Sequence, residues 1–271
     1  MIRGIVAQKQ RKAGKQKEED RSSGLGPFYW ILGVVAVIGV VVLVFQLQGR
    51  DAPATQPVQV TLSPAELAQV EGVSVGDPQA PVTILEFADF SCPACGDFAA
   101  LFNPVVKERW VETGEARFVR HDFPLVQIHP NGFLAARAAR CAGEQDEYWT
   151  YHDVLYARQG EWRRQDGAAR VFQELASQLG LDRSAFERCL RSDRWAEEVT
   201  ENMQLGASMN VPGTPTFFVN GVQVEMGRTL GDALEAMEQE IQRALAAGGD
   251  PSPEDAGVGP GGDVPVPDPD L

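Results

Sequence analysis

The most constraining feature of this 271-residue chain is a pair of cysteines set where an apolar run gives way to a helical pattern. The run covers residues 82–90, and Cys92 and Cys95 follow it directly. This order predicts a buried strand that leads into a helix beginning at the cysteines. Because unpaired N–H groups and the helix dipole stabilise a thiolate there, we expect Cys92 to be the more acidic and more exposed sulfur.

Two cysteines at this spacing are also typical of half a tetrahedral zinc site, which would need a second close pair of ligands. The remaining cysteines stand alone, and the histidines lack zinc spacing, so His121 and His129 are interpreted as loop or capping residues. A purely structural disulfide of this size would close too small a ring to add much stability. Reversible thiol–disulfide exchange is the favoured chemistry, and we expect no metal and no other cofactor.

Both ends of the chain are predicted to be disordered. Residues 1–27 carry seven basic and three acidic side chains with almost no apolar pattern. Residues 248–271 combine glycine and proline with six acidic side chains and no basic one. The rest of the chain is acidic within a formal net charge of -14, which argues against nucleic acid as a partner.

An uncharged apolar run from Phe28 to Phe45 would form a helix of about 27 Å, just long enough to span a bilayer. We therefore expect one transmembrane helix over residues 28–47 of a single-pass membrane protein. The basic residues before it predict a cytoplasmic N-terminus and an extracytoplasmic catalytic domain. A cleaved signal peptide is the alternative, because Ala52-Pro53-Ala54 offers an A-x-A pattern. Either way the cysteines would meet an oxidising compartment.

Residues 48–72 are predicted to form a linker with one short helix capped by Ser63, and residues 73–247 to form the folded domain. Its predicted order is strand, helix, strand, helices, strand, strand, helix, with a hairpin turn at Asn220-Gly221. About 90 residues separate Leu125 from Pro215, more than a simple crossover needs. We therefore expect a helical subdomain inserted at about residues 126–208 of an α/β fold.

Three stretches of the chain resemble the exported bacterial thiol–disulfide oxidoreductases of the DsbA type. They are Glu86-Phe87-Ala88-Asp89-Phe90-Ser91-Cys92-Pro93-Ala94-Cys95, residues 138–151, and Val211-Pro212-Gly213-Thr214-Pro215-Thr216-Phe217-Phe218-Val219-Asn220-Gly221. The resemblance covers about residues 73–247. It implies a thioredoxin fold with an inserted helical subdomain, which in this chain would follow the transmembrane helix.

The resemblance also implies that Pro215 follows a cis peptide bond and faces the cysteines, where the residues alone would favour a trans loop proline. The backbone of Thr214 could then pair with an extended substrate. Pro93 and Ala94 are assigned to the same substrate-binding surface.

Glu86 lies six residues before Cys92, where the wider thioredoxin superfamily often places a buried acid. We expect it to relay a proton to or from Cys95, with a solvated strand carboxylate as the alternative. Cys141 and Cys189 fall on apolar helix faces and could be buried free thiols. Export and the resemblance favour a structural disulfide between them.

The resemblance implies an oxidase whose Cys92–Cys95 disulfide accepts electrons from cysteines of exported proteins and is restored by a quinone-linked membrane partner. A reductase or isomerase kept reduced by a membrane electron donor is the first alternative, and redox potential separates the two. The second alternative is a tethered peptide-binding holdase without redox turnover, in which replacement of Cys92 would leave the function intact.

Overall fold

The computed structural model describes residues 26–48 and 53–248. The chain divides into two compact units, Met1–Ala52 and Pro53–Leu271. The first unit contributes α1 (Gly26–Gln48), whose side chains are described over residues 29–43 and are all exposed there.

No helix in the described part of the chain combines the length and apolar character that a membrane crossing needs. The predicted transmembrane helix, residues 28–47, extends beyond the side chains described for α1, and it stays a prediction. The predicted tails, 1–27 and 248–271, lie almost wholly outside the described residues.

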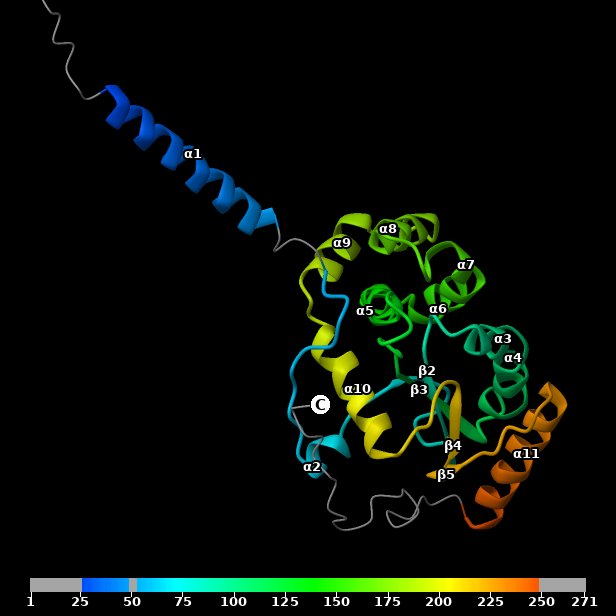
Figure 1. Cartoon of the computed structure of the whole chain (residues 1–271). Helices are drawn as coiled ribbons and strands as arrows, with labels where there is room; N and C mark the ends of the chain where they lie inside the picture. The colour runs from blue at the N-terminus through cyan, green and yellow to red at the C-terminus, as the bar shows by residue number, and fades with distance from the viewer. Residues whose placement is uncertain (1–25, 49–52, 249–271) are drawn as a thin grey trace, which may run out of the picture. The chain divides into compact units, whose positions relative to one another are not determined.

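Within the described residues of the second unit, five strands form one mixed sheet in the order β1-β3-β2-β4-β5 (Figure 1). They are β1 (Val73–Val75), β2 (Val82–Ala88), β3 (Ala116–Asp122), β4 (Thr216–Val219) and β5 (Val222–Gln223). The central β2 and β3 run parallel, and the other pairs are antiparallel. Most side chains of β2 and β3 are buried, as a sheet covered by helices on both faces requires.

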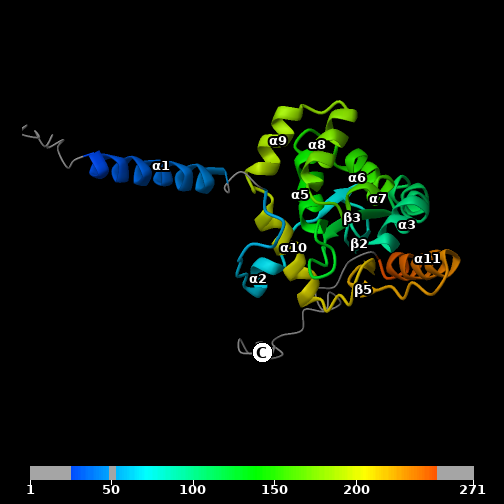
Figure 2. The same cartoon turned by 45° about the horizontal axis from the view of Figure 1, so that its top comes forward.

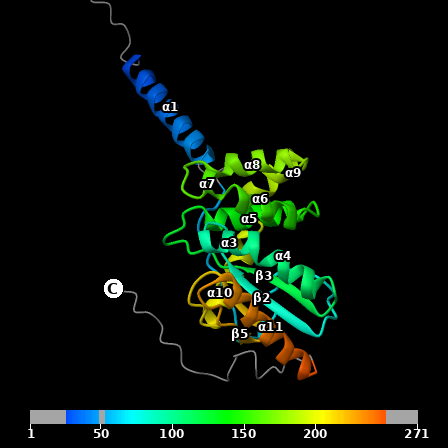
Figure 3. The same ribbon diagram turned by 90° about the vertical axis from the view of Figure 1, so that its right-hand side faces the viewer.

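One face of the sheet is covered by α3 (Pro93–Leu101), α4 (Asn103–Val106), the π-helical turn η1 (Lys107–Val111) and α11 (Leu230–Ala246), as Figure 3 shows. Phe102, Phe118, Phe217 and Met237 are fully buried between these layers. The helix expected behind the cysteines is divided at Phe102, because Pro104 lacks the N–H that would continue the first helix.

The other face of the sheet is covered by α10 (Ala196–Ser208), which packs against β3. Gly206 permits this close approach, since a Cβ atom there would lie 2.6 Å from the ring of Phe123. The helix therefore rests on the aromatic side chains beneath it.

The helices between β3 and α10 gather at one end of the sheet (Figure 2). They are α5 (Gly132–Gly143), α6 (Tyr148–Ala157), α7 (Gln159–Trp162), α8 (Ala168–Gln178) and α9 (Arg183–Arg191). Tyr151, Trp162, Phe172 and Phe186 are fully buried in their common core. This layer begins and ends within the insertion predicted at 126–208, whereas the last helix of that range, α10, packs on the sheet.

Residues 53–63 of the predicted linker form neither helix nor strand, and they are bound to the domain. The Ala54 carbonyl accepts a hydrogen bond from the buried Arg137 guanidinium, and the Ala54 N–H donates to Asp193 at 2.8 Å. Further along, the Gln204 amide donates to the Val60 carbonyl at 2.7 Å. A buried guanidinium needs acceptors, and the segment supplies one of them. The short helix α2 (Pro64–Leu67) follows with the expected capping box at Ser63.

Candidate active site

The cysteine pair stands at the turn between β2 and α3. Cys92 is the N-cap residue of α3, and Pro93 occupies the first helical position, where its missing N–H costs nothing. The helical layer holds this turn from outside, because the Gln159 amide donates to the carbonyls of Phe90 at 2.7 Å and Cys92 at 2.9 Å. Cys92 is 7% exposed and Cys95 is fully buried, and both are free thiols here.

The two sulfurs have opposite acidities. A hydrogen bond from the Cys95 side chain, helped by the Thr214 side chain and the Cys95 backbone N–H, lowers the pKa of Cys92 to about 6 against the cost of burial. Burial raises the pKa of Cys95 well above its ordinary value. Near neutral pH the pair therefore holds a thiolate at Cys92 and a thiol at Cys95.

The start of β4 lies beside the reactive sulfur. The Thr214–Pro215 peptide bond is cis, and the Cys92 thiol donates to the Thr214 carbonyl over 3.3 Å. Pro93 and Ala94 are exposed next to it. The sequence-predicted pair and the sequence-predicted proline thus meet in one place.

Glu86 lies on β2, buried to 1% exposure. Burial raises its pKa, while the Arg120 charge, the Asn103 side chain and Lys107 act in the opposite direction. The charge of Glu86 also contributes to the high pKa of Cys95. Glu86 is therefore an enclosed acid near Cys95, and the solvated alternative does not describe it.

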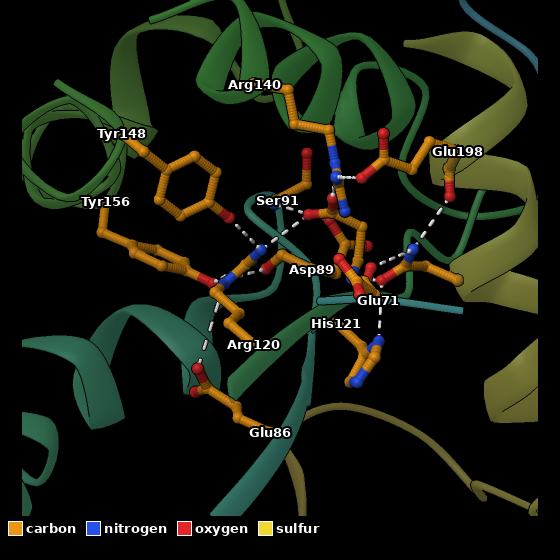
Figure 4. Close-up of polar contacts among 12 residues, drawn as sticks. Glu71, Glu86, Asp89, Ser91, Arg120, His121, Arg140, Tyr148, Tyr156 and Glu198 are labelled. Atoms are coloured by element: carbon orange, nitrogen blue, oxygen red, sulfur yellow. Dashed lines mark hydrogen bonds and ion pairs between the residues drawn. The ribbon is translucent and has the colours of Figure 1, made fainter. Parts of the chain in front are cut away.

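Arg120 pairs in register with Glu86 on the neighbouring strand and is the centre of a buried polar network (Figure 4). Its guanidinium donates to Asp122 at 2.6 Å and to the hydroxyls of Tyr148 and Tyr156 at 3.1 Å each. It also lies 3.9 Å above the ring of Phe90.

The network continues through Arg140. Its Nε donates to the Asp122 carboxylate at 2.7 Å, and its guanidinium also donates to the Glu198 carboxylate. The sequence analysis missed these residues. The available signal was the presence of Arg120 and Asp122 within the second strand of the predicted order, because charges in a covered strand are buried only when paired.

Asp89 is buried in the turn between β2 and the cysteines. Its carboxylate accepts hydrogen bonds from the Ser91 N–H at 2.7 Å and the Leu125 N–H at 2.9 Å, and it contacts His129 Nδ1 at 2.6 Å. Residue 132 must be glycine for this packing, since a Cβ atom there would lie 2.6 Å from the carboxylate. His129 is a loop residue, as the sequence suggested, but it belongs to the site. The same interpretation was wrong for His121, which is buried on β3.

Cys141 of α5 and Cys189 of α9 are joined by a disulfide with a sequence separation of 48 residues. This bond ties two helices of the helical layer together.

A thioredoxin-type sheet, a dithiol at a helix start and a proline loop facing it define the class of thiol–disulfide oxidoreductases. A family model described as Thioredoxin matches residues 68–239, and the chain belongs to this family.

Two curated relatives illustrate the match. The Na(+)/H(+) antiporter NhaA 3 of Salinispora tropica is 36% identical over 192 residues, covering 66% of this chain but only 27% of that protein. Disulfide bond formation protein D of Bacillus subtilis is 26% identical, over 72% of this chain and 84% of that protein. The chain thus spans about a quarter of the antiporter's length and most of the second relative's.

Solved structures show the same fold. BdbD from Bacillus subtilis matches with a TM-score of 0.57 and 23% identity, over 72% of this chain and 99% of that one. The α-DsbA1 protein of Wolbachia pipientis matches with a TM-score of 0.57 and 20% identity, over 67% and 98%. The expected resemblance to the DsbA type is confirmed.

Proposed function

We propose that this protein is an extracytoplasmic oxidase that introduces disulfides into exported proteins through Cys92 and Cys95. The observation that carries the proposal is the asymmetry of the pair, with the pKa of Cys92 lowered to about 6 beside a buried, protonated Cys95. A stabilised thiolate stabilises the reduced form, and a stable reduced form makes the disulfide oxidising.

The reaction consists of two exchanges. A substrate thiolate attacks the Cys92 sulfur of the oxidised pair, the Cys92–Cys95 bond breaks, and Cys95 leaves and takes up a proton. A second substrate thiolate then attacks the substrate sulfur bound to Cys92 and expels the Cys92 thiolate. Two electrons pass from the substrate dithiol to the enzyme disulfide, one proton stays on Cys95, and the other is released above pH about 6.

Glu86 is the proposed proton relay for Cys95. It is buried, its pKa is raised by burial, and its charge acts on the Cys95 thiol. A carboxyl group whose pKa has moved toward neutrality suits proton transfer to a leaving thiolate.

An extended substrate segment would lie along the backbone of Thr214 and against the exposed Pro93 and Ala94. The Thr214 carbonyl oxygen lies 3.3 Å from the Cys92 sulfur, so a chain paired with this backbone would bring its cysteine to Cys92.

The rest of the proposed cycle requires a membrane anchor and a membrane protein that reoxidises the cysteines. Residues 28–47 would anchor the domain with the N-terminus in the cytoplasm, and a quinone-linked membrane protein would reoxidise the cysteines. The support is the apolar run and the basic residues that precede it.

The redox potential tests the direction of the reaction. Reduced protein is equilibrated with mixtures of reduced and oxidised glutathione, and the disulfide fraction is read by thiol trapping, with a Cys92→Ser variant as the blank. An oxidase is expected at a potential clearly above that of thioredoxin, about -270 mV, in the direction of that of DsbA, about -120 mV, whereas a value at or below that of thioredoxin would favour the reductase.

The holdase alternative is tested with Cys92→Ala. The oxidase requires loss of disulfide formation in a reduced substrate protein, and full function of the variant would contradict it.

A further inference from the structure

The active site contains an ion pair that the exchange reaction, as described above, does not use. Asp89 and His129 lie 2.6 Å apart beside the cysteine turn. The Asp89 carboxylate is fully buried, whereas the His129 side chain is 17% exposed and can exchange protons with solvent. Two backbone N–H groups, from Ser91 and Leu125, fix the carboxylate in place.

This fixed carboxylate is close to the reactive sulfur in both chain and space. The Cys92 N–H donates to the Asp89 carbonyl at 3.0 Å, so the two residues share one turn. The Cys95 hydrogen bond dominates the lowered pKa of Cys92, but the Asp89 charge acts against it. A buried negative charge is therefore an obstacle to the thiolate unless a cation offsets it.

His129 is placed to be that cation. Its pKa is raised, first by the hydrogen bond with Asp89 and further by the charges of Asp89 and Cys92, while Arg163 lowers it. On the side of the sulfur, the facing groups are Cys95, Thr214 and Asp89.

We propose that the His129 imidazolium neutralises Asp89 and thereby sets how strongly the reduced protein holds the Cys92 thiolate. His129 is a positioning residue that acts through Asp89, and it makes the dithiol pair more oxidising when it is protonated. The inference rests on the proposed function only in taking Cys92 as the sulfur that exchanges.

The stability of the reduced form therefore depends on pH. Above pH about 6 the reduced form carries a Cys92 thiolate, and below the raised pKa of His129 it also carries the imidazolium. Between these limits the reduced form is stabilised, and the stabilisation is lost as pH rises through the pKa of His129. Because coupling is reciprocal, the thiolate must also hold the proton on His129.

The first test measures this reciprocity in the unaltered full chain. Histidine ring NMR signals are titrated in the oxidised and the reduced protein. His129 is expected to lose its proton at higher pH in the reduced protein. His121 and His152 are internal controls, because burial lowers the pKa of each to about 4. Identical His129 titrations in the two redox states would overturn the inference.

The second test uses His129→Gln, which keeps a hydrogen-bond donor and removes the charge, and His129→Lys, which keeps the charge without the titration. At pH 6.5, where a histidine with a raised pKa is mostly protonated, the glutamine variant should be about tenfold less oxidising in its equilibrium with glutathione, the size expected for loss of one nearby charge. The lysine variant should remain closer to the native protein and lose the pH dependence. A glutamine variant with native equilibrium at every pH would contradict the inference.

The proposed oxidase function and the proposed role of His129 can be refuted independently. An oxidising potential with no response of His129 to redox state removes this inference and leaves the proposed oxidase. A strongly reducing potential with a clear His129 response removes the oxidase and leaves the coupling.

Discussion

At the scale of the residue, two identical side chains three positions apart have different chemistry because their surroundings differ. Cys92 accepts hydrogen bonds at the start of α3, which lower its pKa. Cys95 is buried, and both its burial and the nearby charge of Glu86 raise its pKa. Hydrogen bonds to a thiolate favour it, and desolvation disfavours it. The nucleophile and the buried thiol are thus assigned by environment.

Replacing Glu86 with Gln should slow exchange by roughly 100-fold or more near neutral pH, because an amide cannot relay the proton that Cys95 gains or loses. It should also flatten the pH profile, since the pKa of Glu86 is raised by burial and its titration would disappear. Turnover of a reduced peptide substrate is measured between pH 5 and 9, about the range of these groups. The exposed Glu112→Gln variant is the matched control, and a native profile for the Glu86 variant would rule out the relay.

At the scale of the element, the sequence predicted the junction between β2 and α3, but it did not predict the distant residues that contact this junction. The apolar run predicted β2, and the following Cys-Pro-Ala-Cys predicted the start of α3, because the local residue pattern and helix capping decide where these two elements begin. The three-residue β1 was not among the predicted strands, because so short a strand has no alternation to detect.

The groups that act on the cysteines from elsewhere could not be placed by local pattern. Arg120, His129 and Gln159 lie 28 to 67 positions after Cys92 along the chain, and only the tertiary fold brings them to the turn or beneath it. Long-range contacts of this kind depend on topology, which spacing alone does not give.

The disulfide between α5 and α9 gives a prediction at the same scale. Replacing both Cys141 and Cys189 with Ala should lower the free energy of unfolding by about 4 kcal/mol, the chain-entropy value for a loop of this length. Urea unfolding of oxidised protein measures it, in a background where Cys92 and Cys95 are both Ser so that only this bond differs. Coincident unfolding curves would show that the bond contributes nothing.

At the scale of the whole molecule, the proposed function requires a catalytic domain outside the cytoplasm and an anchor in the membrane. Residues 53–63 are hydrogen-bonded to Arg137 of the helical layer and to Gln204 of α10, the helix that packs on the sheet. The compact unit Pro53–Leu271 includes these residues, which the sequence assigned to the linker.

The full chain is expected to stay in the membrane fraction after an alkaline wash, because residues 28–47 supply about 30 Å of apolar helix. A variant lacking these residues should be recovered in the soluble fraction. Mass spectrometry of the N-terminus gives the decisive reading. A mature protein that begins at Thr55 would replace the anchor with a cleaved signal peptide and leave export intact.

The acidity of Cys92 is the most direct test of the whole account. The reduced protein is titrated while its thiolate absorbance is followed, with Cys92→Ser as the reference that removes this sulfur alone. The account predicts a transition with a midpoint at pH about 6, which the reference lacks. A transition near pH 8.5, about the value of an unperturbed cysteine, would contradict it.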